Sequence, residues 1–158
     1  MRFEQVDRSS EALVNNLLDL YMYDMSEWFG VAPDDEGRFG YIAFDHFETN
    51  KPVYVAFEGE QPAGFALVTT ESEHEIEEFF LIRRYRHRGI AQQFARHLWT
   101  QHPGEWIIRV LEDNLPAVPF WRKAVCLHIG KLTPRRCIRN DGGVSAAVST
   151  RLSTRKCK

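Results

Sequence analysis

The stretch Arg86-His87-Arg88-Gly89-Ile90-Ala91 decides the fold, because it joins two segments of different periodicity. The apolar run 76–82 before it has the pattern of a buried strand, and residues 91–99 after it carry apolar side chains at helical spacing. The first N–H groups of a helix lack partners inside the helix and attract anions, and a glycine lets a ligand approach the backbone closely. The stretch predicts a phosphate-binding turn, although an ordinary turn with solvated arginines would have the same pattern.

A second segment, Asn114-Leu115-Pro116-Ala117-Val118-Pro119-Phe120-Trp121, begins another expected helix and favours the phosphate-binding interpretation. With both segments, the chain resembles the GNAT N-acetyltransferases, a superfamily that uses acetyl-CoA. The pyrophosphate loop of that family has the pattern Arg/Gln-x-x-Gly-x-Gly/Ala, and Arg86, Gly89 and Ala91 match it.

The later helix of the family carries the pattern Asn-x-x-Ala-x-x-aromatic/Leu-Tyr, which Asn114, Ala117 and Phe120 match. Trp121 stands where the pattern has Tyr. The resemblance covers residues 50–125 well and the rest more loosely. It is nearest to uncharacterised bacterial acetyltransferases that have Glu-Phe-Phe in the strand before the loop, so it leaves the acceptor open.

Length and composition are typical of one globular domain. The chain has 158 residues, of which 44% are hydrophobic, and a net charge of −2. We expect a single domain over residues 1–158, with a frayed tail after about residue 152. No apolar run approaches the roughly 20 residues of a membrane span, and the N-terminus lacks the apolar core of a signal peptide. We therefore expect a cytoplasmic protein without a membrane partner.

The three cysteines, Cys126, Cys137 and Cys157, are widely spaced and form no Cys-x-x-Cys pair. Neither a zinc site nor a disulfide framework is indicated, so we expect no metal cofactor. The weakly negative net charge also gives no general attraction to nucleic acid. A nucleic-acid-binding protein that uses the basic residues 83–88 and the basic tail is the weaker alternative.

Patterns along the chain predict its elements. Apolar alternation or runs predict strands at 2–6, 52–58, 63–70, 75–82 and 106–111, and helical spacing predicts helices after Ser9 or Ser10, over 91–99 and from Asn114. Residues 21–29 either continue the first helix or form a second one, 31–40 is a loop, and 41–48 is ambiguous. Residues 131–138 and 144–152 can pair as a hairpin across 140–143.

The fold class implied by the resemblance is mixed α/β (α+β). It has a mostly antiparallel sheet of about six to seven strands, flanked by about four helices. Its two central strands, here 75–82 and 106–111, run parallel and splay apart. The arm of the cofactor enters that gap and pairs with the exposed backbone of the first strand.

The resemblance also assigns residues to acetyl-CoA. The backbone N–H of Leu81 is the expected donor to the oxyanion, which makes Leu81 a catalytic candidate. The expected cofactor-binding residues lie on the first central strand, in the turn and at the start of the later helix: Phe80, Leu81, Ile82, Arg86, His87, Arg88, Gly89, Ile90, Ala91, Asn114, Ala117, Phe120 and Trp121.

Transfer to an amine needs the amine in its neutral form, so a base is useful. Glu77 and Glu78 lie on the strand beside the predicted thioester, and strand alternation lets only one of them face the cleft. We expect Glu78 to be the base, because the resembled group places its Glu directly before the two Phe. Glu75 and Glu77 are weaker candidates, and ordinary solvated glutamates are the alternative.

The proton for the leaving thiolate lacks its usual donor. Trp121 replaces the Tyr of many relatives, and an indole N–H is not a usable acid. The thiolate then takes its proton from water or from Tyr21, Tyr23 or Tyr85. Alternatively, Phe120 and Trp121 simply pack.

Residues near the end of the first helix are expected to form the acceptor wall, as in relatives. They include Tyr21, Tyr23, Asp24 and Trp28, and we assign Tyr21, Asp24 and Glu77 to substrate binding. A negative field that suits a cationic amine is expected from Asp24, Asp34, Asp35, Asp45 and Glu48. Plain core residues and a solvated acidic surface are the alternatives.

The sequence thus predicts an acetyl-CoA-dependent N-acetyltransferase that acts by direct transfer on the primary amine of a small, cationic acceptor. One alternative is a catalytically weak acyl-CoA-binding or sensor protein, which Trp121 favours and Glu78 disfavours. Another is an acetyltransferase that acts on a protein or an RNA-linked amine. The oligomeric state stays open, and a homodimer is compatible with the sequence.

Overall fold

The computed structural model describes residues 1–39, 47, 51–111, 113–129, 136–139 and 147–153. Seven strands of this part form one sheet in the order β1-β2-β3-β4-β5-β7-β6. The strands are β1 (Arg2–Val6), β2 (Val53–Glu58), β3 (Gln61–Thr70), β4 (His74–Leu81), β5 (Glu105–Leu111), β6 (Arg136–Arg139) and β7 (Ala147–Ser153). All neighbours are antiparallel except β4 and β5, so the predicted mixed fold is confirmed.

Three α-helices cover the sheet in the described part: α1 (Glu11–Phe29), α2 (Ile90–Gln101) and α3 (Ala117–Ile129). Two short 3-10 helices, η1 (Arg8–Ser10) and η2 (Arg83–Tyr85), precede α1 and follow β4. About four helices were expected. Residues 21–29 form no second helix, because α1 continues without a break to Gly30, where the left-handed backbone (φ 63°) ends it.

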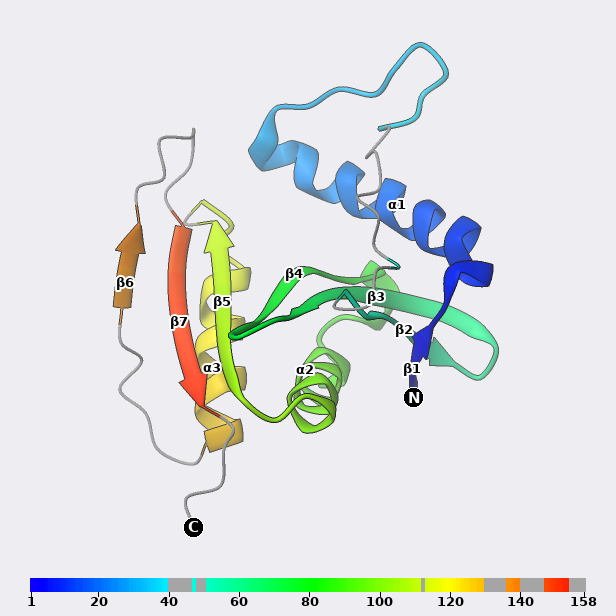
Figure 1. Ribbon diagram of the computed structural model, residues 1–158. Coiled ribbons are helices and arrows are strands. Elements are labelled where there is room, and N and C mark those ends of the chain that lie inside the picture. The colour runs from blue at the N-terminus through cyan, green and yellow to red at the C-terminus, as the bar shows by residue number, and fades with distance from the viewer. Residues whose placement is uncertain (40–46, 48–50, 112, 130–135, 140–146, 154–158) are drawn as a thin grey trace.

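The sheet is apolar on both faces. On β2, Val53 and Val55 pack with α1, whereas Tyr54 and Ala56 belong to the core under α2 and α3. Figure 1 shows this arrangement, with α1 on one side of the sheet and α2 and α3 on the other. Burial on both faces explains why β2, β3 and β5 are nearly continuous apolar runs in the sequence.

The C-terminal strands β6 and β7 pair antiparallel, as the predicted hairpin requires, and β7 adds to β5. The proposed turn at 140–143, the ambiguous stretch 41–46 and the tail 154–158 lie outside the described residues. Of the helices in the described part, none combines the length and apolarity that a membrane span needs.

Candidate active site

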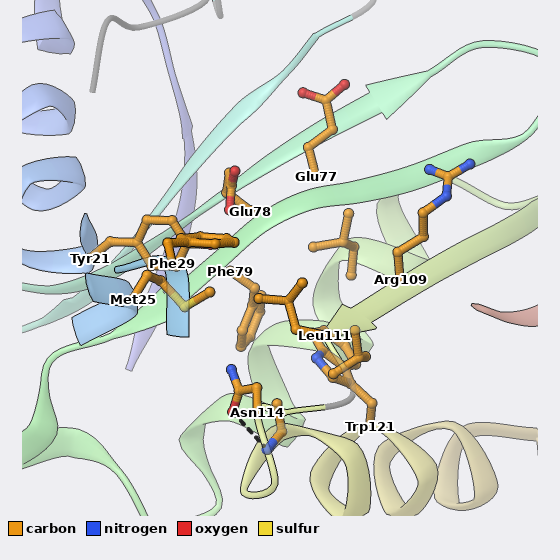
Figure 2. A pocket seen from close by; sticks show the side chains of 13 residues that line it. Tyr21, Met25, Phe29, Glu77, Glu78, Phe79, Arg109, Leu111, Asn114 and Trp121 are labelled. Carbon is orange, nitrogen blue, oxygen red and sulfur yellow. Dashed lines mark hydrogen bonds between the residues drawn. The ribbon is translucent and has the colours of Figure 1, made fainter. Parts of the chain in front are cut away.

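The two parallel strands separate at the centre of the sheet. β4 and β5 pair only through His74–Trp106, Glu75–Ile107 and Ile76–Ile108, although both strands continue beyond these partners. A cavity of about 250 Å³ lies where they diverge. Its lining comes from α1, β4, β5 and the segment that begins α3, as Figure 2 shows. The gap expected for a cofactor arm is thus present as a cavity.

A β-bulge in β4 decides which side chains face this cavity. Leu67 of β3 pairs with Glu78 and Val68 pairs with Ile76, so Glu77 is an extra residue in β4. Both Glu77 and Glu78 line the cavity, and Figure 2 shows both carboxylates on the same side of the strand. The expectation that only one of them faces the cleft is wrong, because the bulge interrupts the strict alternation of the strand.

The two glutamates differ in exposure. Glu77 is exposed and accepts a hydrogen bond from the hydroxyl of Thr69, whereas Glu78 is half-buried. Phe80, two residues after Glu78, is buried against Tyr21 of α1. Glu78 therefore lies on the α1 side of β4, directly after the extra residue of the bulge.

The backbone of β4 beyond the bulge points donors into the gap. The N–H of Ile82 donates to the carbonyl of Ala63 at 2.9 Å, so Ile82 belongs to a hydrogen-bonded pair of the antiparallel ladder. Because such pairs alternate, the N–H groups of Leu81 and Phe79 point away from β3 and toward the gap. This direction is the one that a cofactor arm pairing with β4 requires.

Gly64 allows β3 to lie close to this part of β4. A Cβ at Gly64 would lie 2.1 Å from the carbonyl oxygen of Phe80 and 2.9 Å from Cα of Leu81. Real Cβ atoms are not found at such distances from backbone atoms, so any side chain at Gly64 would displace β4. The position of the Leu81 peptide therefore depends on a glycine in the neighbouring strand.

The predicted phosphate-binding turn leads directly into α2. Gly89 is the N-cap, with φ of 73°, and His87 also has a positive φ of 60°. The N–H groups of Ile90 and Ala91 belong to the first turn of the helix, where they have no partner within it. A Cβ at Gly89 would meet nothing within 4 Å, so the space in front of the helix end is open. The geometry suits an anion.

The arginines of the turn have partners within the protein. Both Arg86 and Arg83 bind Asp24 of α1, and Nη2 of Arg83 lies 2.8 Å from the carboxylate. Nε of Arg86 also donates to the carbonyl of Leu81 at 2.7 Å. Arg88 reaches Glu58 at the end of β2, at 3.0 Å.

These contacts concern two residues with predicted roles, Arg86 in cofactor binding and Asp24 in substrate binding. The guanidinium of Arg86 is paired with Asp24 of α1, and the backbone N–H of Arg86 donates to the carbonyl of Arg83. Asp24 does not line the cavity, and its charge is balanced by two cations. The N–H groups of the first turn of α2 have no partner within the helix and are open to an anion.

Asn114 is both a cap and part of the cavity wall. Its Oδ1 accepts from the N–H of Ala117 at 3.2 Å, and its carbonyl accepts from the same N–H at 2.9 Å. This is the N-cap geometry that the sequence predicted. Trp121 lines the cavity beside it and packs against Phe79 with ring centroids 5.0 Å apart. Phe120 also stacks on Phe79, at 6.1 Å, outside the lining.

The three candidate tyrosine acids lie in different places. Tyr21 lines the cavity and is buried between Phe65 and Phe80. Tyr23 is 59% exposed and is not part of the lining, and Tyr85 is buried in the core under α2. Tyr21 is thus the tyrosine among them whose position fits contact with a bound acceptor or thiol.

The predicted site residues leave out seven residues that line the cavity: Met25, Phe29, Ile76, Phe79, Arg109, Val110 and Leu111. Met25 and Phe29 follow Tyr21 at intervals of four, which places all three on one face of α1. That spacing could have found them once the helix was known to continue to Phe29. Arg109 is on β5, and its side chain pairs with Glu75. Nothing in the local sequence distinguishes it from other strand arginines.

No group of three metal-ligating side chains occurs among the residues that the structure describes. A model of the acetyltransferase (GNAT) family matches residues 14–125 of the chain. No match is found among curated proteins.

Several solved acetyltransferases share the fold at low sequence identity. Aminoglycoside 6'-acetyltransferase type Ii has a TM-score of 0.72 and 14% identity, with 100% of both chains covered. Spermidine N-acetyltransferase from Vibrio cholerae, in complex with CoA and spermine, has a TM-score of 0.68 and 12% identity over 97% of this chain and 95% of that one. The ribosomal-protein-S18-alanine N-acetyltransferase from Escherichia coli has a TM-score of 0.65 and 12% identity over 99% and 96%.

Proposed function

Because the chain belongs to the acetyltransferase (GNAT) family, we propose that it transfers the acetyl group of acetyl-CoA directly to the primary amine of a small, cationic acceptor. Acetyl-CoA is the cosubstrate of this family. The single observation that carries the proposal is the cavity between the splayed strands, because two carboxylates line it and the N–H groups of Phe79 and Leu81 point toward the gap between β4 and β5. A base and an oxyanion donor are the two groups that such a transfer uses.

The backbone of β4 and the end of α2 suit the cosubstrate. The N–H groups of Phe79 and Leu81 point into the gap, where the amides of an extended arm can pair with them. The N–H groups of Ile90 and Ala91 face the open space before Gly89, where a pyrophosphate gains from the helix dipole. The N–H of Leu81 then donates to the acetyl oxygen as negative charge develops on it.

The bulge supplies the base. Glu78 takes the proton of the amine, while Glu77, one residue before it, helps to hold the ammonium form before transfer. Trp121 shapes the cavity but has no acidic proton, so the thiolate receives its proton from water or from Tyr21. We assign no proton transfer to Asp24, because it faces the arginines of the turn.

The proposal is tested with the whole chain. Calorimetry should detect acetyl-CoA binding, and a thiol reagent should detect steady CoA release when an amine is added. Release that exceeds the slow background of thioester hydrolysis, with the acetylated amine found by mass spectrometry, supports a transferase. Acetyl-CoA binding without release for any amine would instead favour the acyl-CoA sensor.

A further inference from the structure

The wall that α1 contributes to the cavity carries no charge. Tyr21, Met25 and Phe29 recur at intervals of four residues, so they form one stripe along the helix, and all three line the cavity. Figure 2 shows their side chains together on one side of the cavity, next to Glu78. An acceptor held at Glu78 therefore lies against apolar and aromatic surface.

The outer end of the stripe is open to solvent. Tyr21 and Met25 are buried, but Phe29 is 46% exposed at the last turn of α1. Exposed aromatic surface at the edge of a cavity gains free energy when an apolar group covers it, by roughly 25 cal/mol per Å². The stripe thus offers a place for an apolar substituent that extends from the amine toward solvent.

The charges around the cavity suit a cation near the bulge, and the stripe beyond it suits an uncharged group. Glu77 and Glu78 face the cavity, and so does Arg109, whose guanidinium pairs with Glu75. An ammonium near the bulge is attracted by the two carboxylates and by the aromatic faces of the stripe. A second ammonium that extended along the stripe would lose its hydration against uncharged side chains, and burial of a charge without a partner is costly.

The other acidic residues expected on this side add little within the described part of the chain. Asp24 is balanced by Arg83 and Arg86 and lies outside the lining. Asp34 accepts hydrogen bonds from the N–H groups of Glu36 and Arg38 within its own turn. The negative charge of the described cavity wall therefore comes from Glu77 and Glu78, at the bulge and not along the stripe.

We propose that the acceptor is a primary amine with one positive charge and an apolar, aromatic or alkyl, substituent, and that polyamines and aminoglycosides are disfavoured. The inference rests on the proposed function and names its substrate class. In the transfer, the amine nitrogen bonds to the acetyl carbon and the carbon–sulfur bond breaks. The proton of the amine passes through Glu78 to water, and the CoA thiolate takes up a proton from water or Tyr21.

The test compares kcat/KM for 2-phenylethylamine, spermidine and kanamycin at saturating acetyl-CoA, with CoA release as the signal. We expect 2-phenylethylamine to exceed the other two by about tenfold or more, since pocket contacts discriminate substrates over this range. Equal or faster reaction of spermidine or kanamycin would overturn the inference while leaving the acetyltransferase intact. Acetyl-CoA binding without turnover of 2-phenylethylamine would also overturn it.

Variants separate the stripe from general effects on α1. Phe29→Ala should lower kcat/KM for 2-phenylethylamine by about fivefold to tenfold and leave spermidine nearly unchanged. Leu20→Ala is the matched control, because Leu20 is an exposed apolar residue of α1 outside the cavity, and it should alter neither value. If Phe29→Ala affects all amines equally, the stripe does not select the substituent.

The two hypotheses fail in different ways. Absence of acetyl-CoA binding in calorimetry would contradict the proposed function itself. Normal acetyl-CoA binding together with fast acetylation of a polycation would contradict only the substrate class.

Discussion

Asp24 on α1 and Arg86 in the turn after β4 form an ion pair, although 62 positions separate them in the sequence. The side chain of Asp24 is only 12% exposed, and its other oxygen accepts from Arg83 at 2.8 Å. Arg86 at the same time donates to the carbonyl of Leu81. One carboxylate thereby connects α1 with the turn and, through Arg86, with the end of β4.

Replacement of Asp24 should weaken acetyl-CoA binding more than it weakens binding of the amine. Asp24→Asn keeps the shape of the side chain but removes the charge shared by two guanidinium groups, and we expect the free energy of unfolding to fall by about 1–2 kcal/mol. The KM for acetyl-CoA should rise more than the KM for the amine, because Asp24 lies outside the cavity. Urea denaturation and initial rates measure both effects.

Glu27→Gln is the control for this variant, since Glu27 is an exposed carboxylate on the same helix. The prediction is contradicted if Asp24→Asn, and not the control, raises the KM for the amine more than the KM for acetyl-CoA. Asp24 would then contribute to acceptor binding.

Two substitutions at Gly89 that differ only in charge test whether the phosphates of acetyl-CoA bind at this turn. Any side chain at Gly89 is strained by its positive φ of 73°, but Asn and Asp tolerate this region better than other residues. Gly89→Asp and Gly89→Asn should therefore fold alike, while only Asp places a negative charge where the phosphates approach. We expect acetyl-CoA to bind Gly89→Asp at least about tenfold more weakly than Gly89→Asn in calorimetry. Equal affinities would place the phosphates elsewhere.

Periodicity alone was enough to predict most of the elements that frame the site. The strand before the turn, the helix after it and the cap at Asn114 follow from side-chain spacing and from local hydrogen-bonding chemistry, which act over a few residues. The expected number of strands, about six to seven, and the splayed parallel pair followed from the resemblance and not from spacing, and the order of the strands in the sheet was not predicted.

What the sequence could not supply depends on contacts between distant segments. The bulge at Glu77 arises from the register of β3 against β4. Strict strand alternation therefore placed only one of the two carboxylates, Glu77 or Glu78, at the cleft, whereas both line the cavity. The pairing of Asp24 with Arg86 depends on how α1 lies across the end of β4, and the local sequence assigned each residue to a different ligand. Asp45 and Glu48, expected in the acidic field, lie outside the described residues.

A histidine cluster at the other end of the sheet predicts a pH-dependent stability. Nε2 of His102 lies 2.8 Å from the hydroxyl of Tyr54. Burial lowers the pKa of His102, and the neighbouring His74 and His97 lower it further. Burial also lowers the pKa of His97. The folded protein therefore binds a proton at these sites less readily than the unfolded chain, whose histidines titrate near a pKa of about 6.5.

The direction in which stability changes with pH follows from this difference in proton affinity. Above about pH 6.5 these histidines are neutral in both the folded and the unfolded protein, so their full contribution to stability is present. Below about pH 6.5 the unfolded chain binds protons first, which favours unfolding. We expect the free energy of unfolding to decrease as the pH falls from about 7.5 to 5.5, as urea denaturation can measure. His102→Gln, which keeps a polar partner for Tyr54, should show a shallower decrease. An equally steep decrease in this variant would exclude His102 as a source.

The central claim is that Glu78, at the β-bulge beside the cavity, accepts the proton of the amine. Glu78→Gln keeps the size of the side chain and removes the base, and Glu77→Gln makes the same change one residue earlier in the bulge. Glu77→Gln should mainly raise the KM for the amine, because we assign Glu77 to holding the ammonium group.

The most direct measurement is the pH–rate profile of both variants with an amine that the wild-type protein acetylates. We expect kcat of Glu78→Gln to fall by roughly 10²–10⁴-fold at pH 7 and to recover in part at higher pH, where more of the amine is already neutral. Acetyl-CoA affinity should stay unchanged. A Glu78→Gln protein with the wild-type rate and pH profile would show that water or another residue takes the proton, and would contradict the account.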